Sequence, residues 1–380
     1  MLKIAHILEA TSGGAARAVM ALAAEQSRLG HEVTLIYSPL RADALFRKDK
    51  DALKLKKTIS LPMRREVGPY DIWSAWLLYR ILKQEGPFDV LHGHSSKAGA
   101  LTRLVSVFLR GVKVFYTPHG FISMNKEAAP LYRKIEKRLA SFAHKVIVVS
   151  EAEKQHALDE IGIQEDKLAL VHNGLSFKKV VTRGEARSRM GYSEQNRVFG
   201  FVGRLSAEKN PLRLIKAFAP LALQDSHLHL AILGNGPLLE AVKKEVARQG
   251  IGSGVRFWHD EDARFFIPGF DALVCSSDNE GFPLVFIEGL QNGVPLVSTP
   301  VGGTKECVLD NKTGFVAEDF TKESLSQALR RYLDLLPSTR KSMEMLAAAH
   351  GNNFTAEKMA KETLALYTPF TPKPENPWVR

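Results

Sequence analysis

The chain of 380 residues has little cysteine, no long apolar run and no strong compositional bias. Its two cysteines, Cys275 and Cys307, have no metal-ligating partner at CxxC or HxxC spacing, which argues against structural zinc and against a disulfide framework. No stretch approaches about 18 uncharged apolar residues, and the N-terminus lacks the pattern of a signal peptide. We therefore expect a cytoplasmic protein without a membrane-spanning helix.

Several common catalytic motifs are also absent. The sequence has no GxSxG, no P-loop GxxxxGK and no HExxH, which argues against a serine hydrolase of the α/β type, a P-loop nucleotidase and a zinc protease. With 45% hydrophobic and 24% charged residues, the composition is that of an ordinary globular protein. At roughly 100–200 residues per domain, the length predicts two or three domains.

Basic residues exceed acidic ones, 52 to 41, for a net charge of +11. Residues 1–150 hold 24 basic and 12 acidic side chains, whereas residues 151–380 hold 28 and 29. The whole excess therefore lies in the first 150 residues. Such a surplus is typical of proteins that meet phosphorylated ligands, anionic membranes or nucleic acid.

Short apolar runs of strand length alternate with segments of helical period along the whole chain, which is typical of βαβ units and parallel sheets. Strands are expected at 3–8, 32–37, 89–91, 113–117, 145–149, 198–202, 229–233, 255–258, 272–275, 295–298 and 314–316. Helices are expected at 15–29, 72–84, 97–109, 130–142, 151–161, 211–221, 238–249, 283–291, 322–335 and 339–350. We predict an α/β protein with two tandem Rossmann-like, doubly wound parallel sheets that face each other across a cleft.

The alternation breaks once, and this break divides the chain. Residues 173–196 have glycines, charges and weak periodicity, as expected of a linker between domains. We predict a first domain over 1–172 and a second domain over 197–354. A helix at about 355–367 should pack back on the first domain, and the proline-rich residues 368–380 should form a flexible tail.

Two carboxylates flank a strand-to-helix turn in the second domain. Pro283 suits the first helical turn, so Glu280 lies in the loop before the helix and Glu288 lies within the helix. The turn follows the strand at 272–275, and open α/β sheets bind ligands at the carboxyl ends of their strands. Free N–H groups near Gly281 would point at a phosphate or sugar oxygen, together with the helix dipole.

Cations and glycines occupy equivalent positions after two other strands. Arg204 and Lys209, five residues apart in a loop that enters a helix, can converge on one anionic group such as a diphosphate. Gly13 and Gly14 follow the first strand and would let the backbone come close to a phosphate. No acidic residue follows about 20 positions later, which weakens the case for a dinucleotide site.

Histidines cluster at two strand ends of the first domain. His119 follows a strand and precedes Gly120, which makes it the better candidate for a cleft residue. We expect His92 and His94 to face opposite ways, which argues against a metal site shared by them. No metal ligand set is predicted.

In combination and in this order, the motifs resemble the retaining glycosyltransferases of family 4, of the type that builds bacterial surface polysaccharides and glycolipids and has the two-Rossmann GT-B fold. The resemblance covers nearly the whole chain. It rests on Gly13-Gly14, His119-Gly120, the segment 172–174, Gly203-Arg204 with Lys209, the segment 234–237, Glu280 to Glu288, and Gly302-Gly303 with Glu306.

The resemblance implies how the nucleotide of a sugar donor is held. Arg204 and Lys209 would bind the diphosphate, helped by the backbone near Gly14. Glu288 would bind the ribose hydroxyls. The loop that includes Phe257 and Trp258 would meet the nucleobase through main-chain groups.

The resemblance also implies how the sugar is held and transferred. Glu280 and the N–H groups of Gly281 and Phe282 would bind hydroxyls of the donor sugar, and His119 would lie near its C6 hydroxyl and its reacting carbon. Such enzymes transfer the sugar with retention, while the leaving diphosphate takes the proton of the acceptor. Arg204 would stabilise the departing charge with Lys209, and no metal cofactor is required.

We therefore expect a glycosyltransferase that moves a hexose or N-acetylhexosamine from a nucleotide-diphosphate sugar to a polysaccharide, lipopolysaccharide or lipid-linked acceptor. The segment 95–99 resembles members that use UDP-sugars, so a UDP-sugar is preferred. Two alternatives stay open: an isomerase of the sugar-nucleotide 2-epimerase type, and a non-enzymatic nucleic-acid-binding protein. Against the latter, the basic stretches lack aromatic stacking partners.

Basic stretches at residues 50–65 and 130–140 lie in the domain that receives the acceptor in this fold. Each basic residue close to an anionic leaflet contributes about 1 kcal/mol to binding. We expect peripheral association with the inner face of the cytoplasmic membrane, or binding of a lipid diphosphate acceptor, through these stretches.

Overall fold

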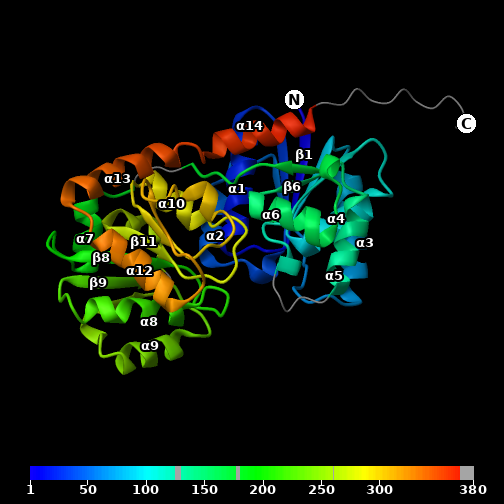
Figure 1. Cartoon of the computed structure of the whole chain (residues 1–380). Coiled ribbons are helices and arrows are strands. Elements are labelled where there is room, and N and C mark those ends of the chain that lie inside the picture. Colours follow the sequence, from blue (N-terminus) through cyan, green and yellow to red (C-terminus); the bar gives the residue numbers. More distant parts are fainter. Residues whose placement is uncertain (125–129, 177–179, 260, 369–380) are drawn as a thin grey trace, which may run out of the picture.

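The computed structural model describes residues 1–124, 130–176, 180–259 and 261–368. Two α/β domains lie side by side, and each is built around its own parallel sheet (Figure 1). The predicted fold class is confirmed. Of the predicted tail, residues 369–380 lie outside the described residues.

The first domain is built on a seven-stranded sheet in the order β3-β2-β1-β4-β5-β6-β7, with parallel pairing throughout. The strands are β1 (Lys3–Leu8), β2 (Glu32–Tyr37), β3 (Lys57–Ser60), β4 (Val90–His94), β5 (Lys113–Thr117), β6 (Lys145–Val148) and β7 (Leu168–Leu170). The helices are α1 (Gly13–Arg28), α2 (Ala44–Ala52), α3 (Tyr70–Glu85), α4 (Ser96–Ser106), α5 (Pro130–Ala140) and α6 (Glu151–His156). Helix α2 and the two edge strands of the sheet, β3 and β7, were not predicted from the sequence.

The second domain is built on a six-stranded parallel sheet in the order β10-β9-β8-β11-β12-β13. Its strands are β8 (Arg197–Val202), β9 (Leu228–Leu233), β10 (Val255–Trp258), β11 (Ala272–Cys275), β12 (Leu296–Ser298) and β13 (Gly314–Val316). Its helices are α8 (Pro211–Ala222), α9 (Leu239–Arg248), α10 (Leu284–Gln291), α11 (Thr304–Cys307), α12 (Lys322–Leu333) and α13 (Pro337–Gly351). All six strands lie where the apolar runs of the sequence predict them.

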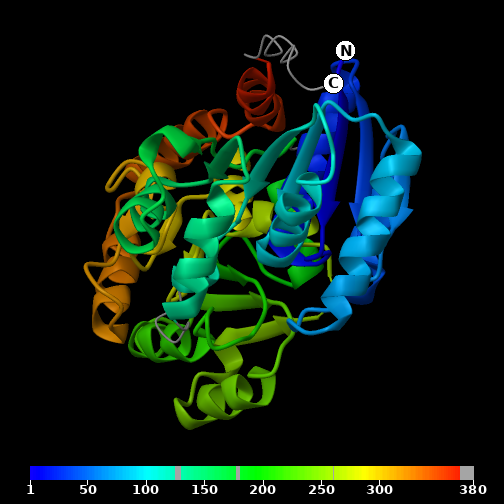
Figure 2. The ribbon, with the colours of Figure 1, turned by 90° about the vertical axis from the view of Figure 1, so that its right-hand side faces the viewer.

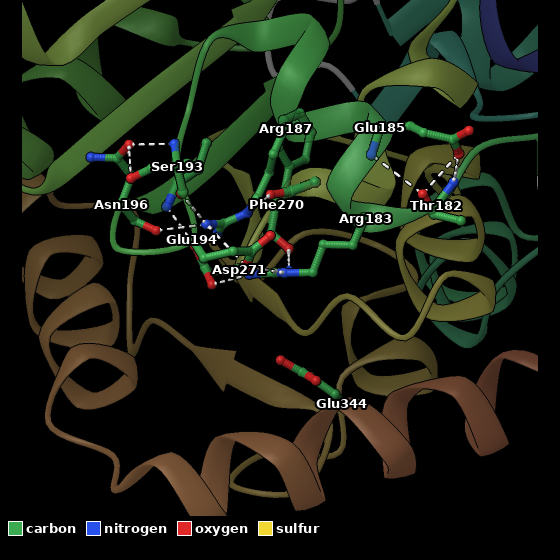
Figure 3. Close-up of polar contacts among 12 residues, drawn as sticks. Thr182, Arg183, Glu185, Arg187, Ser193, Glu194, Asn196, Phe270, Asp271 and Glu344 are labelled. Atoms are coloured by element: carbon green, nitrogen blue, oxygen red, sulfur yellow. Dashed lines mark hydrogen bonds and ion pairs between the residues drawn. The ribbon is translucent and has the colours of Figure 1, made fainter.

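The range 173–196, expected as a linker, contains a helix, α7 (Arg183–Met190). Thr182 caps this helix and forms a capping box with Glu185, and Gly191 ends it in the left-handed conformation. The buried Arg187 donates hydrogen bonds to the carbonyl oxygens of three residues and to Asp271 at 2.7 Å (Figure 3). Arg-rich composition hid this short helix in the sequence, and these bonds fix it to the second domain.

The chain crosses between the domains twice, and the two crossings lie side by side. The first leaves β7 through Gly174 and Leu175, and the second joins α13 to α14 (Ala356–Tyr367). Leu175 N–H donates to the Phe354 carbonyl at 3.1 Å, and a Cβ on Gly174 would lie 2.1 Å from the Thr355 carbonyl oxygen. Gly174 is therefore required by the close approach of the two crossings.

The last helix, α14, packs against α1 of the first domain and lies at the same end of the molecule as the N-terminus in both views (Figures 1 and 2). Tyr367 at its end is buried, and its ring lies 4.6 Å from that of Phe115, measured between centroids. The described residues contain no helix long and apolar enough to cross a membrane.

Candidate active site

A cleft of about 540 Å³ lies between the domains, where loops from both sheets meet. These loops follow β1, β5, β8, β9 and β11, at the carboxyl ends of the strands. Nine residues predicted from the sequence line the cleft, namely Gly13, Gly14, His119, Arg204, Lys209, Glu280, Gly281, Phe282 and Glu288.

Arg204 and Lys209 reach the cleft from the loop between β8 and α8, in different electrostatic states. Lys209 forms an ion pair with Glu280. Burial, the largest single influence, lowers the pKa of Lys209, but the charge and hydrogen bond of Glu280, together with the charges of Cys275 and Glu208, outweigh it, and the pKa is raised. Arg204 is exposed, and its side chain has no hydrogen bond to another described residue. Its guanidinium is available to an anion in the cleft.

This loop is joined to the loop that carries Glu280. Arg213 donates to the Ser276 carbonyl at 2.9 Å and to the Asp278 carboxylate at 2.5 Å. Asn210 also donates to Asp278, at 3.0 Å, and the Asp278 N–H donates to the Glu208 carbonyl at 2.8 Å. The cations and the carboxylate are thus held on one cross-linked pair of loops.

The two predicted carboxylates both have cationic partners. Glu280 accepts a hydrogen bond from Ser277 at 2.7 Å in addition to its pairing with Lys209. Glu288, on α10, accepts from Arg17 of the first domain at 2.5 Å. The negative charge of Glu288 raises the pKa of Arg17. Each carboxylate is therefore paired with a cation and held in a fixed orientation beside the cleft.

No motif in the sequence pointed to Arg17. It lies four residues after Gly13 on α1, so it shares a helix face with the glycine turn that was singled out. That spacing is the signal that could have found it.

The start of α10 points at the cleft, which Pro283 and Leu284 both line. Pro283 is the N-cap of this helix, and the positive end of the helix dipole favours an anion there. Phe282 also lines the cleft, yet its ring stacks on His172 at 5.2 Å and its carbonyl accepts from Asn173 at 3.4 Å. The backbone of this turn, more than the Phe282 side chain, is available to a ligand.

His119 lies in the loop after β5 with a φ of 54°, a left-handed conformation that is uncommon for a residue with a side chain. Its Nε2 lies 3.2 Å from Nδ1 of His94, and its Nδ1 is buried and has no hydrogen-bond partner among the described residues. Burial lowers the pKa of His119 to about 4, so the ring is neutral at pH 7.

The carboxylate of Glu153 holds the loop that follows His119. It accepts from Gly120 N–H at 2.6 Å and from Val149 N–H at 2.7 Å. Burial raises the pKa of Glu153 to about 7, although these hydrogen bonds act in the opposite direction. A Cβ on Gly281 would lie 3.0 Å from the Gly120 nitrogen, so this loop and the Glu280 loop nearly touch across the cleft.

The expectation that His92 and His94 face opposite ways is wrong. Residues two apart on a strand lie on the same face, and here the ring centroids are 4.0 Å apart. Ring nitrogens of His6, His92 and His94 lie within 4.8 Å of one another. Every one of these six nitrogens has a hydrogen-bond partner, so a cation would have to displace existing bonds.

Phe257 and Trp258 are not among the described residues that line the cleft. Trp258 packs on Phe266, with ring centroids 5.6 Å apart, and its carbonyl accepts from Gly234 N–H at 2.9 Å. The following segment, Glu261 to Ala263, lines the cleft instead. The structure thus brings the loop after β10 to the site, but not these two side chains.

The basic stretch at 50–65 is not an amphipathic surface. Leu61 and Met63, which lie between its lysines and its arginines, are buried in the core of the first domain. In the stretch at 130–140, by contrast, Leu131, Tyr132 and Ile135 are exposed on α5. Only this second stretch presents apolar and basic side chains together.

Two Rossmann-like domains with cations, carboxylates and a helix N-terminus around one cleft form an arrangement that suits a phosphorylated ligand. Residues 12–179 match the family described as Glycosyltransferase Family 4, and residues 182–348 match that described as Glycosyl transferases group 1. The chain belongs to the family 4 glycosyltransferases of GT-B fold.

Curated relatives and solved structures agree with this assignment. The chain is 27% identical over 281 residues to UDP-Gal:alpha-D-GlcNAc-diphosphoundecaprenol alpha-1,3-galactosyltransferase of Escherichia coli, covering 70% of this chain and 71% of that one. It is 28% identical over 311 residues to D-inositol 3-phosphate glycosyltransferase of Corynebacterium urealyticum, covering 76% and 73%.

Solved structures share the fold at lower identity. Anabaena HepE, in complex with UDP and glucose, superposes with a TM-score of 0.80 at 19% identity, covering 96% of this chain and 99% of that one. WaaG, a glycosyltransferase involved in lipopolysaccharide biosynthesis, superposes with a TM-score of 0.73 at 18% identity, covering 97% and 100%.

Proposed function

We propose that this glycosyltransferase moves a hexose or N-acetylhexosamine from a UDP-sugar to a lipid-linked or polysaccharide acceptor, with retention of anomeric configuration. The observation that carries the proposal is the convergence of Arg204, Lys209, Glu280 and Glu288 on one interdomain cleft at the N-terminus of α10. The names of the relatives support it. One includes UDP-Gal and a GlcNAc-diphosphoundecaprenol acceptor, and one solved neighbour contains UDP and glucose.

In this proposal the donor spans the cleft with its diphosphate over the cations. Arg204 binds it as a planar fork, and the N-terminus of α10 supplies a second positive field. Lys209 keeps its pairing with Glu280 and adds a point charge on the phosphate side. Glu280 then turns its remaining oxygen to sugar hydroxyls, and Glu288 shares its carboxylate between Arg17 and the ribose.

The chemistry that follows is stabilisation of a departing diphosphate. The bond from the anomeric carbon to the phosphate oxygen breaks, and negative charge grows on that oxygen. Lys209, held by Glu280, is preorganised to stabilise this charge, and Arg204 adds its guanidinium. Electrostatic stabilisation of this kind is commonly the largest contribution to catalysis. The acceptor hydroxyl attacks from the side on which the diphosphate leaves and gives its proton to the phosphate. Protein cations, and not a resident metal, provide the positive charge in this scheme.

We also propose that the first domain rests on an anionic membrane through α3, α4 and α5, the layer that Figure 1 shows on the side away from the second domain. The aromatic face of α3, defined as Ile72, Trp73, Trp76, Arg80 and Lys83, is exposed. Trp73 and Trp76 stack at 4.7 Å, and Arg80 lies 5.1 Å from the Trp76 ring. Tryptophan with basic neighbours is typical of membrane interfaces. We therefore assign the membrane contact to this face of α3 and not to residues 50–65.

The proposal is tested by incubating the purified full chain with UDP-glucose, UDP-galactose, UDP-GlcNAc and UDP-GalNAc in turn, each with and without a polyprenyl-diphosphate-linked GlcNAc acceptor. Glycosylated acceptor detected by mass spectrometry is the expected product, and the anomeric proton coupling in its NMR spectrum reports retention. Conversion of the donor without acceptor would instead support a 2-epimerase. Failure of every donor to react in both arms would contradict the proposal.

A further inference from the structure

A continuous series of hydrogen-bonded side chains runs from α1 through the first sheet to the cleft. Gln26 Oε1 lies 2.7 Å from His6 Nε2, His6 Nδ1 lies 2.9 Å from His94 Nε2, and His94 Nδ1 lies 3.2 Å from His119 Nε2. The first three residues are buried, and His119 lines the cleft. We name these four residues the histidine relay.

The direction of the hydrogen bonds in the relay follows from counting protons. A neutral imidazole has one nitrogen that donates and one that accepts. Burial lowers the pKa of His6 to about 4 and that of His94 well below its usual value, so both rings are neutral near pH 7, as is His119. Gln26 faces His6 with its amide oxygen, which can only accept, so with the amide in this orientation His6 carries its proton on Nε2. His94 must then donate to His6 Nδ1 through its own Nε2, and His119 must donate to His94 Nδ1.

We propose that the histidine relay fixes His119 as the tautomer protonated on Nε2, so that its Nδ1 accepts a hydrogen bond from a hydroxyl of the bound donor sugar. Gln26, His6 and His94 act through His119 and are therefore positioning residues. The resemblance to family 4 implies that this hydroxyl is the 6-hydroxyl; that identity rests on the proposed function, whereas the tautomer does not.

The unpartnered state of His119 Nδ1 supports the proposal. Buried polar atoms in proteins nearly always have a hydrogen-bond partner, and this one has none among the described residues although its ring lines the cleft. A hydroxyl group supplies the O–H that an unprotonated nitrogen needs. A phosphate oxygen would be repelled by the same lone pair, so the relay also favours sugar over diphosphate beside His119.

The neighbouring His92 lies outside the relay. Its Nδ1 bonds Tyr367 Oη at 2.6 Å, and its Nε2 bonds Thr117 Oγ1 at 2.8 Å. It therefore provides a control, because loss of its bond to Thr117 leaves every hydrogen bond from Gln26 to His119 in place.

The tautomer is measured directly by NMR on full-length protein labelled with ¹⁵N in its histidines. Correlations between ring nitrogens and carbon-bound ring protons at pH 7.5 identify the protonated nitrogen, and the signals of His119 are those that disappear in His119→Gln. We expect His119 to be protonated on Nε2 alone. Protonation on Nδ1, or an even mixture of the two tautomers, would overturn the proposal.

Variants then test the relay as the cause. Gln26→Leu removes the acceptor that sets the direction of the bonds, so His119 should become a mixture of tautomers. The kcat/KM for a UDP-sugar that has a 6-hydroxyl should fall about fivefold, the usual effect of losing one hydrogen bond. The kcat/KM for the matching 6-deoxy UDP-sugar, which lacks that hydroxyl, should change little. Gln26→Glu keeps an acceptor oxygen and should restore the Nε2–H tautomer.

Thr117→Val is the matched control, because it removes a buried hydrogen bond to His92 outside the relay. It should leave the tautomer of His119 unchanged. An unchanged tautomer in Gln26→Leu, or an equal change in both variants, would show that the relay does not act on His119. If no donor reacts with any protein, the proposed function fails, and the NMR spectra still decide the relay.

Discussion

Arg17 of the first domain and Glu288 of the second are joined by an ion pair of 2.5 Å between Nη2 and Oε1, directly beside the cleft. The Glu288 side chain is only 3% exposed, whereas that of Arg17 is 25% exposed. A buried carboxylate is costly without such a partner. The pair therefore links the domains at the position where the proposed ribose binds, and a ribose must share Glu288 with Arg17.

The first prediction concerns this carboxylate. Wild-type protein should bind UDP about tenfold more tightly than 2′-deoxy-UDP, because a hydrogen bond to a charged group contributes roughly 1.5–3 kcal/mol. In Glu288→Gln the difference between the two ligands should shrink to about twofold. Isothermal titration calorimetry with UDP and with 2′-deoxy-UDP measures this difference in affinity. Glu280→Gln serves as the control and should keep the ribose preference, and an unchanged preference in Glu288→Gln would remove that carboxylate from the ribose site.

The second prediction concerns the diphosphate. Arg204→Ala should lower kcat by about 100- to 1000-fold, the effect of losing one donor to a developing negative charge. Thermal stability should stay near that of wild type, because the Arg204 side chain has no hydrogen bond to a described residue. Arg330→Ala, an exposed arginine on α12 that does not line the cleft, is the matched control and should retain full activity. Near wild-type turnover by Arg204→Ala would refute its role.

The third prediction concerns the backbone of the Glu280 loop. A Cβ on Gly302 would lie 2.2 Å from the Glu280 carbonyl oxygen and 2.9 Å from that of Gly281. Gly302→Ala should displace this loop and weaken UDP binding about tenfold, within the usual cost of overpacking. Gly184→Ala is the control, because a Cβ at Gly184 meets nothing within 4 Å. Equal UDP affinity of the two variants would contradict the claim that a side chain at position 302 displaces the Glu280 loop.

The fourth prediction concerns pH. Burial raises the pKa of Glu153 from 4.5 to about 7, so the folded protein binds a proton here between these values and the unfolded chain does not. The stabilisation that Glu153 contributes to the folded protein is therefore fully present below pH 4.5 and is lost as the pH rises from 4.5 through 7. The total loss in the free energy of unfolding is about 3 kcal/mol.

Glu153→Gln removes this titration. The stability of wild type relative to Glu153→Gln should fall between pH 5 and pH 8, as measured by thermal unfolding of both proteins. The comparison is needed because the lowered pKa values of His6 and His119 act in the opposite sense between about pH 6.5 and 4. A pH-independent difference would show that Glu153 does not titrate in this range.

The fifth prediction concerns the membrane. Full-length protein should bind vesicles containing phosphatidylglycerol more tightly than pure phosphatidylcholine vesicles, and salt should weaken the binding. The double variant Trp73→Ser/Trp76→Ser should lower the affinity at least about tenfold, because it removes the apolar area of both rings that would be buried in the membrane. Leu336→Ser is the control, since Leu336 is exposed in the second domain. Equal losses in the two proteins would contradict a specific role of the aromatic face of α3.

The sequence located most of the cleft because the signals are local. Gly13, Arg204 and Glu280 each follow an apolar strand directly, and parallel sheets bring the carboxyl ends of their strands to one edge. The edge elements gave weaker signals. Strand β3 has the polar sequence of Lys57–Ser60, in which no side chain is buried, so it shows no apolar run.

Other features depend on distances along the chain that periodicity does not encode. Arg17 and Glu288 are 271 residues apart, and only the packing of the two domains brings them together. Gln26 reaches His119 only through His6 and His94, and no motif distinguishes His6 from the apolar residues of its strand. The wrong assignment of His92 and His94 to opposite faces came from the interpretation of the pattern, since a period of two places them on one face.

The central claim, that the interdomain cleft holds the nucleotide of a sugar donor, is tested most directly by isothermal titration of the full chain with UDP, GDP and ADP, alongside Arg204→Ala. The account predicts saturable binding of UDP at one site per chain, weaker binding of GDP and ADP, and loss of UDP binding in the variant by about tenfold or more. Absence of binding by all three nucleotides, or UDP binding that Arg204→Ala leaves unchanged, would contradict it.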